Sequence, residues 1–524
     1  MNQNTFRSFL ILLLTAAPLF VFGQTNDTAD LTAKIRRIDE YARKTQQDWK
    51  VPGMAIAIVK DDKVVFAKGY GVREIGKSEL VDENTVFAIA SNSKAFTTAA
   101  LAVLVDEKKI RWDDKVSQYL PEFQMPDAYV TRELTVRDLV SHRSGLGTFS
   151  GDLLWYETTF SSDEILRRVR FLKPTSSFRA AYGYQNLMFV AAGKIVEKIS
   201  GKSWAEFVRE RILTPLAMNN TTTSVKDFKP GANIAKPHNE SGSNGLRALH
   251  HGNVDGGAAA AALNSSAVDV AKWLRLQLGK GKFEGKQIFS EAQSWQMWQP
   301  AIAIPISQPS AQFNPTRRFS GYGLGWFLND YQNRKVISHG GGLDGMISQT
   351  AMMPEENLGL VVLTNSETPV NTILQNKIFD IFVNAPARDW SAELLERTRK
   401  GKETEAEEDK KLVAARAANT KPSLPLASYA ATYSSPLGDT VIAEENGKLV
   451  LRMPQAPNFV ADLEHWHYDT FQIRWRPTVA YNFPRGFVVF TIDQNGKPDE
   501  MKINQPNNDF WFYELELKRV AEKK

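Results

Sequence analysis

The stretch Phe87-Ala88-Ile89-Ala90-Ser91-Asn92-Ser93-Lys94-Ala95-Phe96 runs directly into Thr97–Val105, which is rich in alanine, leucine and valine. This composition predicts a buried helix that begins close to Ser91. Lys94 follows Ser91 at spacing i, i+3, so one helix face carries both the hydroxyl and the ammonium. Burial that lowers the lysine pKa would let Lys94 take the serine proton. The pattern therefore predicts an activated serine nucleophile; the alternative is a polar cap on a core helix, with a solvated lysine.

A tyrosine and an asparagine form the second candidate element. Tyr184-Gln185-Asn186 follows a predicted loop and precedes a helix expected at Val190–Ile199. On an extended loop, a phenol and an amide two residues apart can face one cleft. Tyr184 is therefore a candidate proton relay, and Asn186 a candidate for holding a substrate amide. The similar triplet Tyr331-Gln332-Asn333 lies between two predicted strands and is interpreted as a hairpin turn.

A glycine-rich segment forms the third candidate element. His339-Gly340-Gly341-Gly342 ends the predicted strand Val336-Ile337-Ser338. Glycines let a substrate chain lie against a strand edge, and their N–H groups can supply half of an oxyanion hole. The alternative is a glycine turn that carries a surface histidine.

The order Ser-x-x-Lys, Tyr-x-Asn, His-x-Gly resembles the serine β-lactamase-like superfamily, specifically its class C β-lactamase, D-alanyl-D-alanine carboxypeptidase and esterase branch. Further matching segments are Leu139–Leu146, Leu213–Met218 and Tyr322–Trp326. The resemblance implies an α+β fold of the β-lactamase/transpeptidase type. In that fold a mostly antiparallel sheet is flanked by helices, and the site lies between the sheet and a helical subdomain.

The resemblance also implies a role for each matching residue. Ser91 would be the nucleophile, Lys94 and Tyr184 the acid/base pair, Asn186, His339 and Gly341 the substrate-binding residues, and the N–H groups of Ser91 and Gly342 the oxyanion hole. We expect no cofactor and no metal, because the histidine pairs His250-His251 and His465-Trp466-His467 have no accompanying His-Glu-x-x-His motif. His142 is predicted to pack a loop, and an α/β-hydrolase is excluded by the lack of a Gly-x-Ser-x-Gly elbow.

Composition shifts divide the chain into four parts. Residues 1–23 carry an arginine, an apolar run and a final glycine, which predict a secretory signal peptide, with an uncleaved anchor as the alternative. Residues 24–387 form the hydrolase domain, which opens with a helix near Thr32–Gln47 and an antiparallel hairpin, Met54–Lys60 with Lys63–Tyr70. Residues 388–422 are a charged linker, either a solvated helix or a flexible connector.

Short β-rich runs and two Asn-Gly turns, at 446–447 and 495–496, make residues 423–524 a small antiparallel β-barrel-like domain. Its role cannot be read from the sequence.

The overall composition limits location and partners. A net charge of +5 over 524 residues, with no basic stripe, argues against nucleic acid as a partner. The chain has no cysteine, which removes disulfides, thiolate metal sites and a cysteine nucleophile. We expect a protein secreted across the inner membrane, with the periplasm as the best fit and extracellular release as the alternative. No stable membrane span is expected after processing, and the sequence does not indicate an oligomeric state.

The residue at position 339 narrows the substrate. Where β-lactamases with a Lys-Thr-Gly motif carry a fixed positive charge, this chain has His339. A histidine is largely neutral above its ordinary pKa of ~6.5. Recognition of a substrate carboxylate should therefore be weak and should rise as His339 protonates. The sequence thus predicts an exported serine hydrolase that acts on esters, amides or D-amino-acid-containing peptides, with peptidoglycan fragments as one candidate substrate. The alternatives are a β-lactamase that opens β-lactam rings and a non-catalytic penicillin-binding-like sensor.

Overall fold

An antiparallel hairpin near the start of the chain lies at one edge of the main sheet. The computed structural model describes residues 24–240 and 245–521, so the predicted signal peptide lies outside the described residues. Strands β1 (Gly53–Lys60) and β2 (Lys63–Gly71) form the predicted hairpin. Helix α1 (Gln24–Asp48) precedes it and is longer than the sequence pattern indicates.

The main sheet has eight strands, and each neighbouring pair is antiparallel. From the β2 edge the order continues β1, β14 (Leu358–Thr364), β13 (Met346–Met353), β12 (Arg334–Leu343), β11 (Phe327–Tyr331), β10 (Ser320–Tyr322) and β9 (Ile302–Ala303). Gln332 and Asn333 turn the chain between β11 and β12, as the sequence predicts. The predicted antiparallel α+β fold is confirmed.

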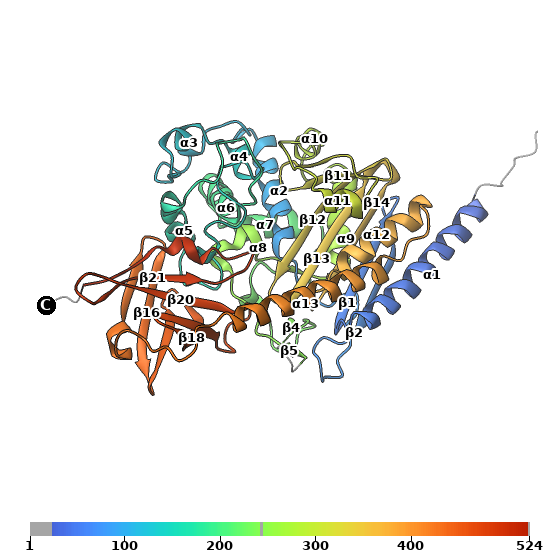
Figure 1. Ribbon diagram of the computed structural model, residues 1–524. Coiled ribbons are helices and arrows are strands. Elements are labelled where there is room, and N and C mark those ends of the chain that lie inside the picture. Colours follow the sequence, from blue (N-terminus) through green and yellow to red (C-terminus); the bar gives the residue numbers. More distant parts are fainter. Residues whose placement is uncertain (1–23, 241–244, 522–524) are drawn as a thin grey trace, which may run out of the picture.

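Both faces of the sheet are buried, because helices cover each of them (Figure 1). Along β1, Met54, Ile56 and Ile58 belong to a core shared with α1 and α12 (Val370–Val383). The intervening residues Ala55 and Ala57 belong to the larger core on the opposite face. A strand buried on both faces reads as a continuous apolar run, which is how β1 appears in the sequence.

The larger core packs a helical region against the sheet. Its main helices are α2 (Ser93–Asp106), α6 (Asn186–Ser200), α7 (Trp204–Val208), α8 (Ala258–Ala261) and α9 (Ala267–Leu278). The smaller helices are α3 (Ala128–Glu133), α4 (Val136–Leu139), α5 (Ser162–Arg168), α10 (Glu291–Met297) and α11 (Gln308–Phe313). Short paired strands are β3 (Phe87–Ala88) with β6 (Asn264–Ser265), β4 (His238–Glu240) with β5 (Leu246–Ala248), and β7 (Lys282–Phe283) with β8 (Lys286–Gln287). In the part of the chain that the structure describes, no helix is both long and apolar enough to cross a bilayer.

A long polar helix connects the sheet domain to the C-terminal domain. Of the two forms predicted for the charged segment, the structure shows the helix, α13 (Trp390–Ala414), which is exposed over most of its length. Beyond it lies a closed eight-stranded barrel (Figure 1). Its strands are β15 (Ala431–Ser435), β16 (Gly438–Glu445), β17 (Lys448–Met453), β18 (Ala456–His467), β19 (Thr470–Trp475), β20 (Gly486–Ile492), β21 (Pro498–Asn504) and β22 (Leu517–Arg519). The two Asn-Gly turns join β16 to β17 and β20 to β21, where the sequence predicts hairpins.

The barrel packs directly on a loop of the hydrolase domain. Glu514 accepts hydrogen bonds from the Ser150 hydroxyl at 2.5 Å and from the Gly151 N–H at 2.9 Å. The Trp511 ring packs so closely on Gly147 that a Cβ there would lie 2.3 Å from the ring. The loop between α4 and α5 is therefore held by the barrel as well as by its own domain.

A buried carboxylate holds a neighbouring part of this loop region. Asp138 of α4 is fully buried, accepts from the Thr135 N–H in a capping box, and forms ion pairs with Arg143 and Arg179, both at 2.6 Å. These partners hold the pKa of Asp138 below its usual range, despite the opposing effect of burial. Asp138 thus neutralises two arginines and caps the start of α4.

We expect Asp138→Asn to lower the stability of the fold by about 2 kcal/mol, because the half-buried Arg143 and the exposed Arg179 both lose the buried carboxylate with which they pair. Asp113→Asn is the matched control: Asp113 pairs with Arg137 but is exposed, so its loss should cost less than about 1 kcal/mol. Thermal unfolding by calorimetry compares the two variants. Equal melting temperatures for both would contradict the assigned role of Asp138.

Candidate active site

Ser91 lies in a tight turn between the sheet and α2. The residues Ala90–Asn92 form a 3-10 turn directly ahead of α2, so Ser91 precedes the helix and does not form its first residue. Ala90 has φ 44°, a left-handed conformation that is strained for a residue with a side chain. The Ser93 hydroxyl donates to the Ala90 carbonyl at 2.6 Å and stabilises the turn. Local strain at this point is consistent with a functional constraint.

Lys94 is fully buried beneath Ser91. Its Nζ donates to Ser91 Oγ at 2.9 Å, to Asn186 Oδ1 at 2.7 Å and to the Ala260 carbonyl at 3.0 Å. Burial lowers the pKa of Lys94 to about 7, and the charge of Asp152 partly opposes this shift. The amine can therefore exist unprotonated near neutral pH, when it can accept the serine proton.

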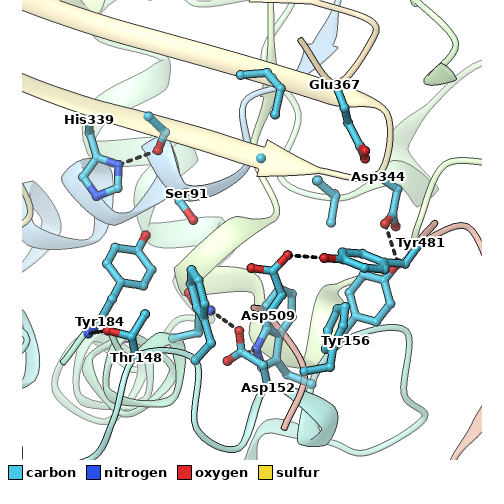
Figure 2. Close-up of a pocket in the computed structure, with 18 of the residues that line it drawn as sticks. Ser91, Thr148, Asp152, Tyr156, Tyr184, His339, Asp344, Glu367, Tyr481 and Asp509 are labelled. Carbon is cyan, nitrogen blue, oxygen red and sulfur yellow. Dashed lines mark hydrogen bonds between the residues drawn. The ribbon is translucent and has the colours of Figure 1, made fainter. Parts of the chain in front are cut away.

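Tyr184 lies close to both Ser91 and Lys94. Its ring lies 4.7 Å from Lys94 Nζ, measured to the ring centroid, and its hydroxyl points toward Ser91 (Figure 2). Burial raises the pKa of Tyr184 well above its ordinary value. The resting side chain is therefore a phenol, suited to donating a proton.

Asn186 joins Lys94 to a carboxyl group that sequence reasoning missed. Its Nδ2 donates to Asp152 Oδ2 at 2.7 Å, and Trp155 Nε1 donates to Asp152 Oδ1 at 2.8 Å. Burial raises the pKa of Asp152 to about 8. Both ends of the Asn186 amide thus have protein partners, although the residue also lines the cavity. No motif in the sequence singles out Asp152.

Strand β12, which carries the three consecutive glycines, forms the cavity wall opposite Tyr184. It also packs against the turn that carries Ser91. A Cβ on Gly341 would lie 2.1 Å from the Ile89 carbonyl oxygen, so β12 packs against the chain that leads to Ser91. Gly341 lies on β12 between the lining residues Gly340 and Gly342, and its expected role in substrate binding stays a prediction. Ser348 of β13 donates to the same Ile89 carbonyl at 2.8 Å. Ser91 and Gly342 do line the cavity; their oxyanion role stays a prediction.

His339 is buried and neutral. Its Nδ1 lies 2.6 Å from the Gly340 carbonyl oxygen, and its Nε2 lies 3.0 Å from the Tyr322 hydroxyl. The Gly340 contact requires a proton on Nδ1, so Nε2 accepts from Tyr322. Burial lowers the pKa of His339 to about 3, and the Lys94 charge adds to the shift. The expectation that His339 protonates in the ordinary histidine range, and so strengthens carboxylate binding, is wrong for this environment.

The remaining histidines have structural surroundings. His142 is buried, accepts from the Gln185 N–H at 2.9 Å and packs its ring 4.2 Å from that of Tyr184, in agreement with a loop-packing role. His250 contacts Glu157 at 2.6 Å. Over residues 24–240 and 245–521, no cluster of three or more histidine, aspartate or glutamate side chains could hold a metal ion.

A cavity of about 670 Å³ opens above Ser91 and has two different ends. Figure 2 shows Tyr184 and His339 on one side of Ser91, and Asp344, Glu367 and Tyr481 on the other. The lining also includes four residues of the barrel: Tyr481, Asn482, Asp509 and Phe510. Within residues 24–240 and 245–521, no lysine or arginine lines it. Sequence reasoning gave the barrel no place in the site, because no local pattern indicates where a separate domain docks.

The chain matches two protein-family models and resembles several known proteins. A family model described as Beta-lactamase matches residues 38–379, and a model described as Domain of unknown function (DUF3471) matches residues 415–519. The chain is 30% identical over 340 residues to an unguisins hydrolase of Aspergillus campestris, covering 63% of this chain and 61% of that protein. It is 27% identical over 335 residues to protein flp of Staphylococcus aureus strain MW2, covering 63% of each. The chain spans less than two thirds of the length of both relatives.

Two solved structures with a similar fold cover 90% and 67% of this chain. The octameric penicillin-binding protein homologue from Pyrococcus abyssi has a TM-score of 0.59 at 20% identity, over 90% of this chain and 98% of that one. The D-amino acid amidase from Ochrobactrum anthropi SV3, complexed with D-phenylalanine, has a TM-score of 0.56 at 20% identity, over 67% and 100%. At these identities the similarity establishes the fold.

The pKa of Lys94 gives a testable pH dependence. We expect kcat/KM on a neutral ester to rise with pH and level off with an apparent pKa of about 7, as Lys94 loses its proton. In Asp152→Asn this limb should move to lower pH, because the charge that raises the Lys94 pKa is gone.

Asp163→Asn, which alters an exposed carboxylate of α5, is the matched control and should leave the limb in place. The measurement is a pH profile of kcat/KM for each variant. A limb that stays fixed in Asp152→Asn would contradict the electrostatic coupling between Asp152 and Lys94.

Proposed function

Because the chain belongs to the Beta-lactamase family, we propose that this serine hydrolase is exported and works through an acyl-enzyme on Ser91, with esters, amides or D-amino-acid-containing peptides as substrates. The observation that carries the proposal is the fully buried Lys94, whose Nζ lies 2.9 Å from Ser91 Oγ at the floor of a cavity. A capping lysine would be solvated, and Lys94 is not.

Acylation follows from this geometry. Neutral Lys94 takes the Ser91 proton as Oγ attacks the substrate carbonyl carbon, and the N–H groups of Ser91 and Gly342 stabilise the oxyanion. The phenol of Tyr184 donates its proton to the leaving nitrogen or oxygen as the acyl bond breaks. The proton held by Lys94 then returns to Tyr184.

Deacylation uses the same groups in reverse. A water molecule attacks the acyl carbon and gives up one proton to the Lys94–Tyr184 pair. Ser91 Oγ leaves as the ester bond breaks and takes a proton back from Lys94. The enzyme returns to its starting protonation state.

The relatives support the substrate classes in the proposal. One relative is named an unguisins hydrolase, and one similar structure is a D-amino acid amidase. The apolar segment before residue 24 supports export to the periplasm or beyond. Peptidoglycan fragments belong to the proposed range because they contain D-amino-acid amide bonds.

We expect Ser91→Ala to abolish both turnover of a chromogenic ester and covalent labelling by a fluorophosphonate, because no other group holds the activated oxygen. Ser177→Ala, in an exposed loop, is the matched control and should label like the parent. Intact-mass analysis after ester exposure separates a hydrolase from a sensor: the hydrolase returns to its unmodified mass, and a sensor stays acylated. Retained labelling in Ser91→Ala would overturn the assignment of the nucleophile.

The charge of the cavity predicts the relative kcat/KM values for different substrates. Asp152, Asp344, Glu367 and Asp509 line the cavity, and in the part of the chain that the structure describes no lysine or arginine does, so a substrate carboxylate gains no charged partner in the lining. We expect kcat/KM for a chromogenic cephalosporin to be at least about a hundredfold below that for a short-chain ester. Parallel assays on both substrates and on a D-alanyl-D-alanine peptide test this order. Faster turnover of the cephalosporin would favour the β-lactamase alternative.

A further inference from the structure

The end of the cavity away from Tyr184 is acidic and is built by both domains. Asp344 follows β12, Glu367 follows β14, and Asp509 belongs to the segment between β21 and β22 of the barrel. Figure 2 shows these three carboxyl groups together with Tyr481, which the barrel also supplies. The tyrosine hydroxyl donates to Asp509 Oδ2 at 2.8 Å. Segments far apart in sequence thus form one acidic wall.

Asp344 has an oxygen without a partner. Its Oδ1 accepts a hydrogen bond from the Tyr156 hydroxyl, while its Oδ2 is buried and has no hydrogen-bond partner among the described residues. The residue is only 7% exposed, yet it lines the cavity. A buried, unpaired carboxylate oxygen is costly unless the group takes up a proton or a ligand supplies a partner.

The three carboxyl groups also lack a cation. Glu367 accepts from the Gly345 N–H at 2.8 Å, but in the described parts of the chain no lysine, arginine or histidine forms an ion pair with Asp344, Glu367 or Asp509. Glu157 beside them differs, because it pairs with His250 at 2.6 Å. Burial raises the pKa of Asp344 to about 7, and the charges of Glu157 and Glu367 add to the shift. The charge of His250 opposes this shift, but among the described residues no cation contacts the three carboxyl groups directly.

An organic cation suits the wall better than a metal ion. The described residues contain no cluster of three or more acidic or histidine side chains arranged to hold a metal. The acidic side chains are spread along one end of an open cavity and are interleaved with the aromatic residues Tyr156, Tyr481 and Phe510. Carboxylates and aromatic faces together are typical surroundings for a substrate ammonium group.

The position of Tyr184 decides which part of the substrate carries the ammonium. The leaving group must lie near Tyr184, which donates the proton to it. The acyl part therefore extends from Ser91 in the opposite direction, toward Asp344 and Asp509 (Figure 2).

We infer that the wall formed by Asp344, Glu367 and Asp509 binds a primary ammonium group in the acyl part of the substrate, so that the enzyme prefers aminoacyl amides and esters with a free amine. This inference rests on the proposed function of Ser91. It also gives the barrel a direct part in substrate selection, through Asp509 and Tyr481.

Two matched substrate pairs test the inference at pH 7.5. The first pair is D-alanine p-nitroanilide and its N-acetyl derivative, and the second is p-nitrophenyl 6-aminohexanoate and p-nitrophenyl hexanoate. Each pair differs by one positive charge, on the α-carbon or at the far end of the acyl chain. We expect kcat/KM for the charged member of at least one pair to exceed that of the neutral member by tenfold or more.

Variants connect this preference to the wall. In Asp509→Asn and in Glu367→Gln, the charged-to-neutral ratio should fall at least fivefold. In Asp499→Asn, which alters an exposed carboxylate on β21, the ratio should stay as in the parent. Fluorophosphonate labelling of Ser91 in every variant verifies that the site is folded, and using two wall variants keeps the test valid if one of them fails to fold.

The outcomes separate the two proposals. Labelling and turnover with charged-to-neutral ratios near one in both pairs would overturn the ammonium site and leave the proposed function intact. A preference that neither wall variant reduces would also overturn it. Absence of both Ser91 labelling and turnover would overturn the proposed function and, with it, this inference.

Discussion

Burial of the Lys94 amine beside the Ser91 hydroxyl is the constraint on which the rest of the structure depends. A lysine normally remains charged and solvated, and here it lies in a core that lowers its pKa to about 7. The protein tolerates this burial because Asn186 and the Ala260 carbonyl accept hydrogen bonds from the amine. The helical region that buries the lysine therefore also sets its chemistry.

The turn that carries Ser91 is held by the sheet as much as by its own helix. Gly341 lets β12 approach the Ile89 carbonyl, and Asn92 exchanges hydrogen bonds with Ser348 at 2.9 Å and Thr350 at 2.6 Å. These contacts fix the nucleophile relative to the strand that forms the cavity wall. A side chain at position 341 would separate β12 from the turn that carries Ser91. Gly341 is therefore needed for packing.

The two ends of the cavity differ in charge. At one end, buried His339 is neutral and Tyr184 of the resting enzyme is a protonated phenol. At the other end, carboxyl groups from the sheet domain meet Asp509 of the barrel. Glu514 fastens the barrel to the loop that precedes Asp152, so docking of the barrel and the geometry near the nucleophile are coupled.

The sequence by itself determined the antiparallel fold, the C-terminal β-domain and the residues gathered around Ser91. These follow from local signals: the apolar pattern of β1, the Asn-Gly turns, and short motifs in which Lys94 and Tyr184 keep fixed spacings. Only the tertiary structure decided the environment of His339, the partnership of Asp152 with Asn186, and the presence of barrel residues in the cavity. Burial, pKa shifts and domain docking depend on contacts between segments distant in the chain, and no local pattern encodes them.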